Sequence, residues 1–178
     1  MIVLKPVLSG TILDIGGGGE GIIGRLYGAQ VIAIDNSQEE LDEAPNGFEK
    51  VLMDACCIDY PDEKFDHATF FYSLMFMNTE TQRKAISEAS RVLKNGGCLH
   101  IWDAEIPSAY PEPFIVDLDI QIKSEFLHTT FGVVSDIQNQ TAASVSDICS
   151  KYGLILKMQN VNDGQFHIVF EKPNTMRF

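Results

Sequence analysis

A run of glycines flanked by acidic residues carries the clearest chemistry in this sequence. Residues 13–21 read Leu-Asp-Ile-Gly-Gly-Gly-Gly-Glu-Gly. The run follows a short apolar strand pattern at 11–15 and leads into a helix pattern at about 20–27. Glycine lets the backbone turn tightly and approach a ligand closely. A strand, a glycine turn and a helix in this order predict the entrance to a nucleotide-type pocket.

Asp14 distinguishes between the ligands that such a turn can hold. The spacing Gly16-x-Gly18-x-x-Gly21 fits the dinucleotide fingerprint literally. A pyrophosphate, however, binds backbone N–H groups at a helix N-terminus and is repelled by a nearby carboxylate. S-adenosylmethionine (SAM) has no phosphate and carries a sulfonium and an ammonium group. The acid beside the turn therefore favours SAM over a dinucleotide.

The composition indicates one acidic domain, residues 1–178. A chain of 178 residues is long enough for a sizeable core, and its net charge is −12 with a pI of about 4.6. A nucleic-acid partner requires a positive field, and anionic membranes attract basic segments. We therefore expect a small-molecule partner, with neither nucleic acid nor membrane. The sequence does not indicate an oligomeric state.

Nothing in the sequence directs the chain out of the cytoplasm. Lys5 and Pro6 interrupt its apolar start, and the longest apolar stretch, 68–77, is too short to span a bilayer. Four cysteines have no Cys-x-x-Cys motif and no metal-ligand spacing: Cys56, Cys57, Cys98 and Cys149. The adjacent thiols of Cys56 and Cys57 suit a soft metal, but we interpret them as small buried hydrophobic residues. We expect a cytoplasmic protein with reduced thiols and no metal site.

Strand and helix patterns alternate through the first hundred residues. One helix is expected at about 20–27, and a second begins after a capping box at Ser37. A third helix begins after a cap at Asn78 or Thr79, and Lys94 and Gly96 mark its end. Strands are expected at 11–15, 31–35, 50–53, 65–71 and 98–102. This alternation predicts a parallel sheet with right-handed crossovers.

The pattern changes after residue 113. Residues 114–123 alternate strictly between apolar and polar side chains, and a turn at 124–125 leads to a second strand at about 126–134. We interpret 113–135 as a hairpin inserted into the domain. A last helix is expected at 142–152, followed by strands at 154–161 and 165–171. The Asn-Asp-Gly sequence at 162–164 predicts the hairpin turn that joins these two strands.

These features resemble the class I SAM-dependent methyltransferase family over residues 12–102. Five motifs in register carry the resemblance: the glycine turn with Asp14, Val-Ile-Ala-Ile-Asp at 31–35, Asp54-Ala55, Phe65-Asp66, and Arg-Val-Leu-Lys-Asn-Gly-Gly at 91–97. The resemblance implies an α/β, Rossmann-like, mostly parallel seven-stranded sheet with helices on both faces and an antiparallel last strand, here with a hairpin after the fifth strand. It also implies methyl transfer from SAM to a small-molecule acceptor by in-line displacement.

The resemblance also implies a set of cofactor-binding residues. The glycines lie against the cofactor, Asp14 faces its ammonium group, an acid at the end of the second strand accepts both ribose hydroxyls, and residues after the third strand contact adenine. Aromatic residues at the carboxyl end of the fourth strand form a wall. The expected set is Asp14, Gly16, Gly17, Gly18, Asp35, Asn36, Asp54, Ala55, Phe70 and Phe71.

No catalytic residue is assigned. In-line displacement depends mainly on alignment, and a base is required only for an acceptor that is protonated at working pH. Asp103 and Glu105 follow the fifth strand and are the better acid/base candidates, ahead of Tyr110 and His128. The other histidines lie inside strand patterns and are interpreted as packed.

Two departures from the family pattern leave alternatives open. The third glycine falls one residue late, at Gly21, and only about ten residues precede the first strand. A roof over the site must then come from the 114–134 hairpin, the loop after the fifth strand or another subunit. The alternatives are an NAD-dependent oxidoreductase and a SAM-binding module without activity.

The segment after the fourth strand concerns the acceptor. Its sequence, Phe-Tyr-Ser-Leu at 71–74, lacks the Asn-Pro-Pro-Tyr motif of nucleic-acid amine methylases.

Overall fold

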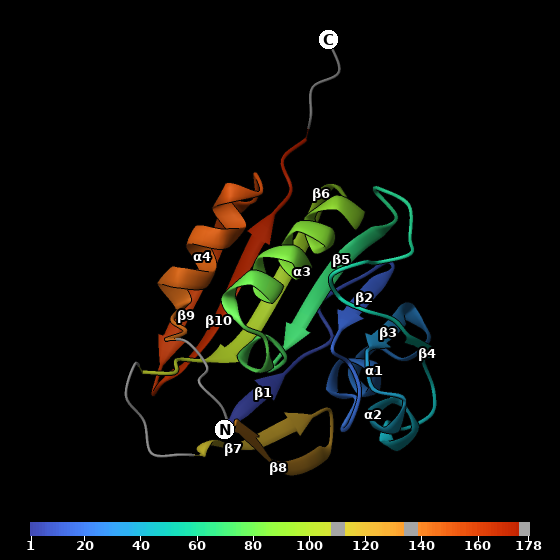
Figure 1. Ribbon diagram of the computed structural model, residues 1–178. Coiled ribbons are helices and arrows are strands. Elements are labelled where there is room, and N and C mark those ends of the chain that lie inside the picture. Colours follow the sequence, from blue (N-terminus) through green and yellow to red (C-terminus); the bar gives the residue numbers. More distant parts are fainter. Residues whose placement is uncertain (108–112, 134–138, 175–178) are drawn as a thin grey trace.

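A seven-stranded sheet forms the centre of the protein, as the computed structural model shows for residues 1–107, 113–133 and 139–174 (Figure 1). Its strand order is β4-β3-β2-β5-β6-β10-β9. The strands are β2 (Ile12–Ile15), β3 (Val31–Asp35), β4 (Glu49–Leu52), β5 (Phe65–Phe71), β6 (Leu93–Ala104), β9 (Ile155–Asn162) and β10 (Gln165–Glu171). The first five are parallel, whereas β10 runs antiparallel to both β6 and β9. The expected fold class is confirmed.

Helices lie on both faces of this sheet (Figure 1). They are α1 (Ile22–Tyr27), α2 (Gln38–Glu43), α3 (Thr79–Val92) and α4 (Ala142–Lys151), with short 3₁₀ turns at Gly28–Gln30 and Leu74–Phe76. Buried side chains of α3 and α4 share one apolar cluster with the sheet, and those of α1 share another on the opposite face. No helix in the described ranges is long and apolar enough to cross a membrane.

The end of α3 differs from the sequence expectation. The helix stops at Val92, and β6 starts at Leu93, where residue 98 was expected. Leu93 has extended backbone angles and pairs with Phe65 of β5. The Lys172 ammonium group donates to the Leu93 carbonyl at 2.8 Å and to the Arg91 carbonyl at 3.3 Å. A cation contributed by the end of β10 therefore caps the helix, which local sequence does not reveal.

A second sheet of three strands lies beside the main one (Figure 1). β7 (Phe114–Ile122) and β8 (Glu125–Val133) are antiparallel, and β1 (Ile2–Leu4) adds to β7 in parallel. The alternation of β7 buries Val116, Leu118, Ile120 and Ile122. Strand β1 was not expected, because three residues followed by Lys5 and Pro6 give almost no strand signal.

Candidate functional site

A cavity of about 530 Å³ opens at the carboxyl ends of β2, β3 and β5. It lies at the point where the strand order reverses, since β3 and β4 extend from β2 on one side and β5 and β6 on the other. Ligands of open α/β sheets bind at such switch points, and the volume is within the usual range for a small-molecule site.

The glycine turn after β2 forms the floor of this cavity and lies too close to its neighbours for any larger residue. The N–H groups of Gly16 and Gly17 both donate to the Ile34 carbonyl, at 2.8 and 3.1 Å. A Cβ at Gly16 would lie 2.5 Å from the Ser73 Cβ, and one at Gly17 would lie 2.5 Å from an Asp14 carboxylate oxygen. The turn is therefore packed directly onto β3 and onto the acid that precedes it.

Asp14 lines the cavity from beneath the glycine turn. Its side chain is 2% exposed, and the Thr69 hydroxyl donates to its Oδ1 at 2.6 Å. Burial raises the pKa of Asp14 to about 7; the Thr69 hydrogen bond opposes this effect. A cationic ligand nearby would stabilise the charged form of this carboxyl.

Asp35 joins the glycine turn to the end of β3. Its Oδ2 accepts from the Gly18 N–H at 3.3 Å, and its Oδ1 accepts from the Ser37 N–H at 2.9 Å. Each carboxylate oxygen has a second lone pair for a ligand hydroxyl. The Ser37 side chain in turn caps α2 by accepting from the Glu40 N–H. The two backbone donors fix the carboxylate at the cavity wall.

The remaining expected residues line the same cavity, with one exception. Asn36, Asp54, Ala55 and Phe71 line the cavity together with Asp14, Asp35 and the three glycines. Phe70 does not, which corrects the expectation for that residue. Neighbouring residues of a strand point to opposite faces. Phe70 is therefore fully buried in the cluster beneath α3 and α4.

Asp103, the first acid/base candidate, is a structural residue in this geometry. It is fully buried and does not line the cavity. Its carboxylate accepts from the N–H groups of Met75 and Ala104, at 3.2 and 2.8 Å, and from the Gln140 amide at 2.9 Å. Burial raises the pKa of Asp103 to about 7. These contacts join β6 to the segments before α3 and α4.

Glu105 and His128 also lie away from the cavity. Glu105 accepts from the Ala142 N–H at 3.4 Å, at the start of α4. His128 is exposed, with its Nδ1 2.9 Å from an Asp119 oxygen on the neighbouring strand. Tyr110 lies outside the described residues. No expected acid or base among the described ones therefore touches the cavity.

Aromatic residues roof the cavity, and most of them were not expected from the sequence. Phe131 of β8 stacks on Tyr72, with ring centroids 5.7 Å apart and ring planes 14° apart. Phe76 contacts the Phe131 ring edge-on, with centroids 6.3 Å apart. Glu20, beside the glycine turn, accepts a hydrogen bond from the Thr129 hydroxyl of the same strand. The hairpin thus supplies part of the roof that the sequence left open.

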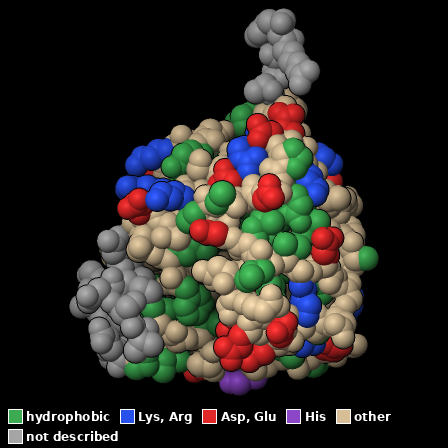
Figure 2. Space-filling view, turned by 45° about the vertical axis from the view of Figure 1, so that its right-hand side comes forward, with side chains coloured by type: hydrophobic (Ala, Val, Ile, Leu, Met, Phe, Trp, Pro, Cys, Tyr) green, Lys and Arg blue, Asp and Glu red, His purple; other side chains and the backbone are tan. Residues whose placement is uncertain are grey.

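The cavity is strongly acidic. Among the described residues, none of those that line it is Lys, Arg or His. Five are carboxylates: Asp14, Glu20, Asp35, Glu40 and Asp54. Burial, followed by the charge of Asp35, raises the pKa of Glu40. Figure 2 shows acidic side chains spread over one face, in its upper and lower parts, while most Lys and Arg side chains lie in the upper part. Such a site attracts a cation and repels a phosphate.

Cys56 and Cys57 follow Asp54 but are not the buried hydrophobic residues that the sequence suggested. Cys57 is exposed and Cys56 is half-buried. The Cys56 N–H donates to the Asp54 carboxylate at 2.8 Å, which shapes the turn after β4. Their position in a turn at the end of an edge strand explains the exposure.

Residues 13–101, half of the chain, match the family model for a methyltransferase domain. The chain belongs to the class I SAM-dependent methyltransferase family. It is thus an enzyme of the methyltransferase type, and the NAD-dependent oxidoreductase alternative is set aside. Among curated proteins, no sequence matches this methyltransferase.

Solved structures of low sequence identity share the fold of this methyltransferase. A SAM-dependent methyltransferase from Methanosarcina mazei is 18% identical, with a TM-score of 0.68 over 97% of this chain and 99% of that one. The glycopeptide N-methyltransferase MtfA, solved with SAM, is 14% identical, with a TM-score of 0.63 over 94% and 89%. The [4+2]-cyclase SpnF is 18% identical, with a TM-score of 0.68 over 94% and 77%. The fold alone therefore does not identify an acceptor.

Proposed function

We propose that this methyltransferase binds SAM in the acidic cavity and transfers its methyl group to a small, apolar or aromatic acceptor. The observation that carries the proposal is the lining of the cavity, in which the described residues place five carboxylates and no cationic side chain around a glycine turn. SAM carries two positive groups and no phosphate. A dinucleotide would place its pyrophosphate against the same carboxylates.

The contacts of the lining residues suggest how SAM would be held. Asp35 is fixed by two backbone donors and has lone pairs directed to the cavity for the two ribose hydroxyls. Asp54 and the Ala55 amide are suited to the adenine edge. Asp14, beneath the glycine turn, would balance the ammonium charge, directly or through water.

The roof gives the proposed chemistry its dry environment. Tyr72, Phe76 and Phe131 would exclude water from the sulfonium, and their ring faces would attract it. Holding the acceptor atom, the methyl carbon and the sulfur in line supplies most of the rate enhancement. The described lining residues include no histidine or lysine, so a lining carboxylate would have to serve as the base for any acceptor that is protonated at working pH.

A transfer assay with methyl-labelled SAM tests this proposal. The purified protein is incubated with a panel of small apolar and aromatic nucleophiles, and in parallel with RNA, DNA and unfolded protein. The proposal predicts label in at least one small molecule and none in the polymers. Label in a polymer would overturn the acceptor class. SAM binding without any labelled product would instead indicate the module without activity.

A further inference from the structure

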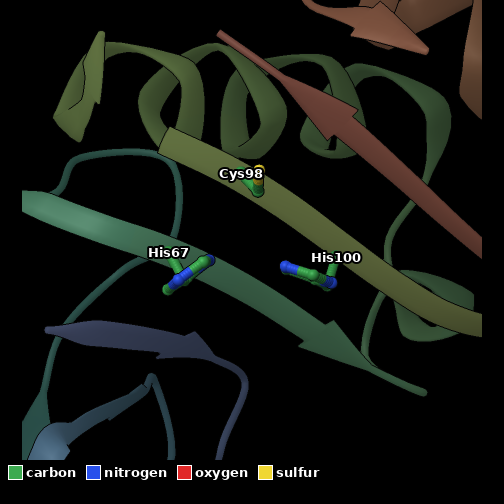
Figure 3. A group of neighbouring side chains, drawn as sticks. All are labelled: His67, Cys98 and His100. Atoms are coloured by element: carbon green, nitrogen blue, oxygen red, sulfur yellow. The ribbon is translucent and has the colours of Figure 1, made fainter. Parts of the chain in front are cut away.

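A second group of side chains able to do chemistry lies on the main sheet, away from the SAM cavity. His67 of β5 pairs in register with Cys98 of β6, and His100 follows two residues along on the same face. One potential ligand atom from each residue lies within 4.8 Å of the others. Figure 3 shows the two imidazole rings, each with a nitrogen directed toward the other, beside Cys98.

The rings of this group pack against one another and, for His100, against Trp102, but this packing leaves two ring nitrogens without a hydrogen-bond partner in the described part of the chain. The Nδ1 atom of His67 and the Nε2 atom of His100 are buried and have no hydrogen-bond partner among the described residues. His100 as a whole is only 8% exposed. A buried nitrogen without a partner is costly and rare in native proteins, so each such atom requires an explanation.

We propose that His67, Cys98 and His100 form a binding site for Zn²⁺. Two imidazole nitrogens and a thiolate are a donor set that zinc prefers, and three protein ligands leave one position for water or another ligand. Bonds of about 2.0–2.3 Å to zinc require the three atoms to approach each other, by rotation of their side chains on binding. On binding, the Cys98 thiol releases its proton to solvent, and both imidazoles coordinate in their neutral form.

The surroundings of the cluster agree with this assignment. A second cavity, of about 600 Å³, reaches His100 between the N-terminal segment and the ends of β6, β9 and β10. This cavity provides an entry path for the ion.

Sequence spacing gave no expectation of this site. Residues 67 and 98 are far apart in the chain, and only the parallel pairing of β5 with β6 brings them together. None of the three residues lines the SAM cavity, so the zinc site is independent of the proposed function.

A metal titration tests the proposal. The starting protein is the full chain with Cys56→Ser and Cys57→Ser, which removes the exposed adjacent thiols as competing ligands. Zn²⁺ is titrated against a chromogenic chelator, and Co²⁺ is added separately to reveal a thiolate-to-metal absorption band. We expect one Zn²⁺ per chain, a Co²⁺ band, and a rise in the melting temperature with Zn²⁺.

Variants then identify the ligands. In Cys98→Ser the Co²⁺ band disappears and the Zn²⁺ affinity falls more than tenfold, and His100→Gln also weakens binding more than tenfold. The matched control is His128→Gln, which removes an exposed histidine and leaves binding unchanged. Circular dichroism checks that each variant is folded.

Two results would overturn the proposal. One is the absence of stoichiometric Zn²⁺ binding and of a Co²⁺ band in the folded starting protein, a result that does not depend on the folding of the ligand variants. The other is undiminished binding in folded Cys98→Ser, which would place the metal elsewhere.

Discussion

The Gly18 N–H donates a hydrogen bond to the Asp35 carboxylate at 3.3 Å, and this contact joins the glycine turn to the end of β3. Replacing Asp35 with alanine removes both this contact and the proposed acceptor of the ribose hydroxyls. We expect SAM binding to weaken by about 1.5–3 kcal/mol, the usual value of charge-assisted hydrogen bonds. Calorimetric titration measures the change. Glu39→Ala, on the exposed face of α2, is the control, and equal affinities in the two variants would remove Asp35 from the site.

The close packing of the glycine turn gives a second prediction. A Cβ at Gly17 would lie 2.5 Å from the Asp14 carboxylate and 2.9 Å from the Ala33 Cβ. Gly17→Ala should therefore lower stability by about 1–3 kcal/mol and SAM affinity at least tenfold. Urea unfolding and calorimetry measure these effects. Gly132→Ala is the control, since no atom lies within 4 Å of its Cβ, and an effect of similar size there would refute the argument.

The stacked pair of Phe131 and Tyr72 gives a prediction about the roof. Phe131→Ala removes the ring that β8 contributes to the cavity, and aromatic pairs contribute about 0.5–1.5 kcal/mol beyond their buried area. We expect kcat/KM for the acceptor to fall about tenfold or more, because water reaches the sulfonium. Phe126→Ala, on the same strand and 70% exposed, should retain activity. Full activity in Phe131→Ala would show that the hairpin does not roof the site.

Asp14 gives a prediction about pH. Burial raises its pKa from 3.8 in the unfolded chain to about 7 in the folded one. The folded state therefore holds the proton more tightly, and the stability present at acid pH is lost as the pH rises through about 7. In Asp14→Asn the free energy of unfolding should fall less as the pH rises, and urea unfolding from pH 4 to 8 measures the difference.

The same carboxyl should make SAM binding depend on pH. The charged form attracts the ammonium group, so affinity should rise by up to about tenfold between pH 6 and pH 8, and the rise should be smaller in Asp14→Asn. Comparing the two proteins cancels the titration of SAM itself. Asp103→Asn should leave the rise intact, because Asp103 is equally buried but does not line the cavity. An identical rise in all three proteins would exclude Asp14.

The main sheet was predictable from sequence because its signals are local. Val-Ile-Ala-Ile-Asp at 31–35 forms β3, and the Asn-Asp-Gly turn joins β9 to β10 as expected. The start of β6 and the existence of β1 were not predictable. Leu93 is extended because it pairs with β5, and Ile2–Leu4 is a strand only because β7 lies beside it.

The site was predictable to the same extent. Asp14 and Asp35 lie at the carboxyl ends of β2 and β3, and the glycines follow β2 directly, so their position along the chain fixes their position in space. Phe70 was misplaced because the sequence does not show which of two adjacent aromatic residues faces the cavity. Phe131 was missed because it reaches the cavity from a different sheet, through a contact with Tyr72 that no local pattern encodes.

Parallel calorimetric titrations with S-adenosylhomocysteine and NADH test the central claim most directly. The acidic, phosphate-free site predicts that S-adenosylhomocysteine binds one per chain with micromolar or tighter affinity, and that NADH produces no binding heat. Binding of NADH with no response to S-adenosylhomocysteine would contradict the account.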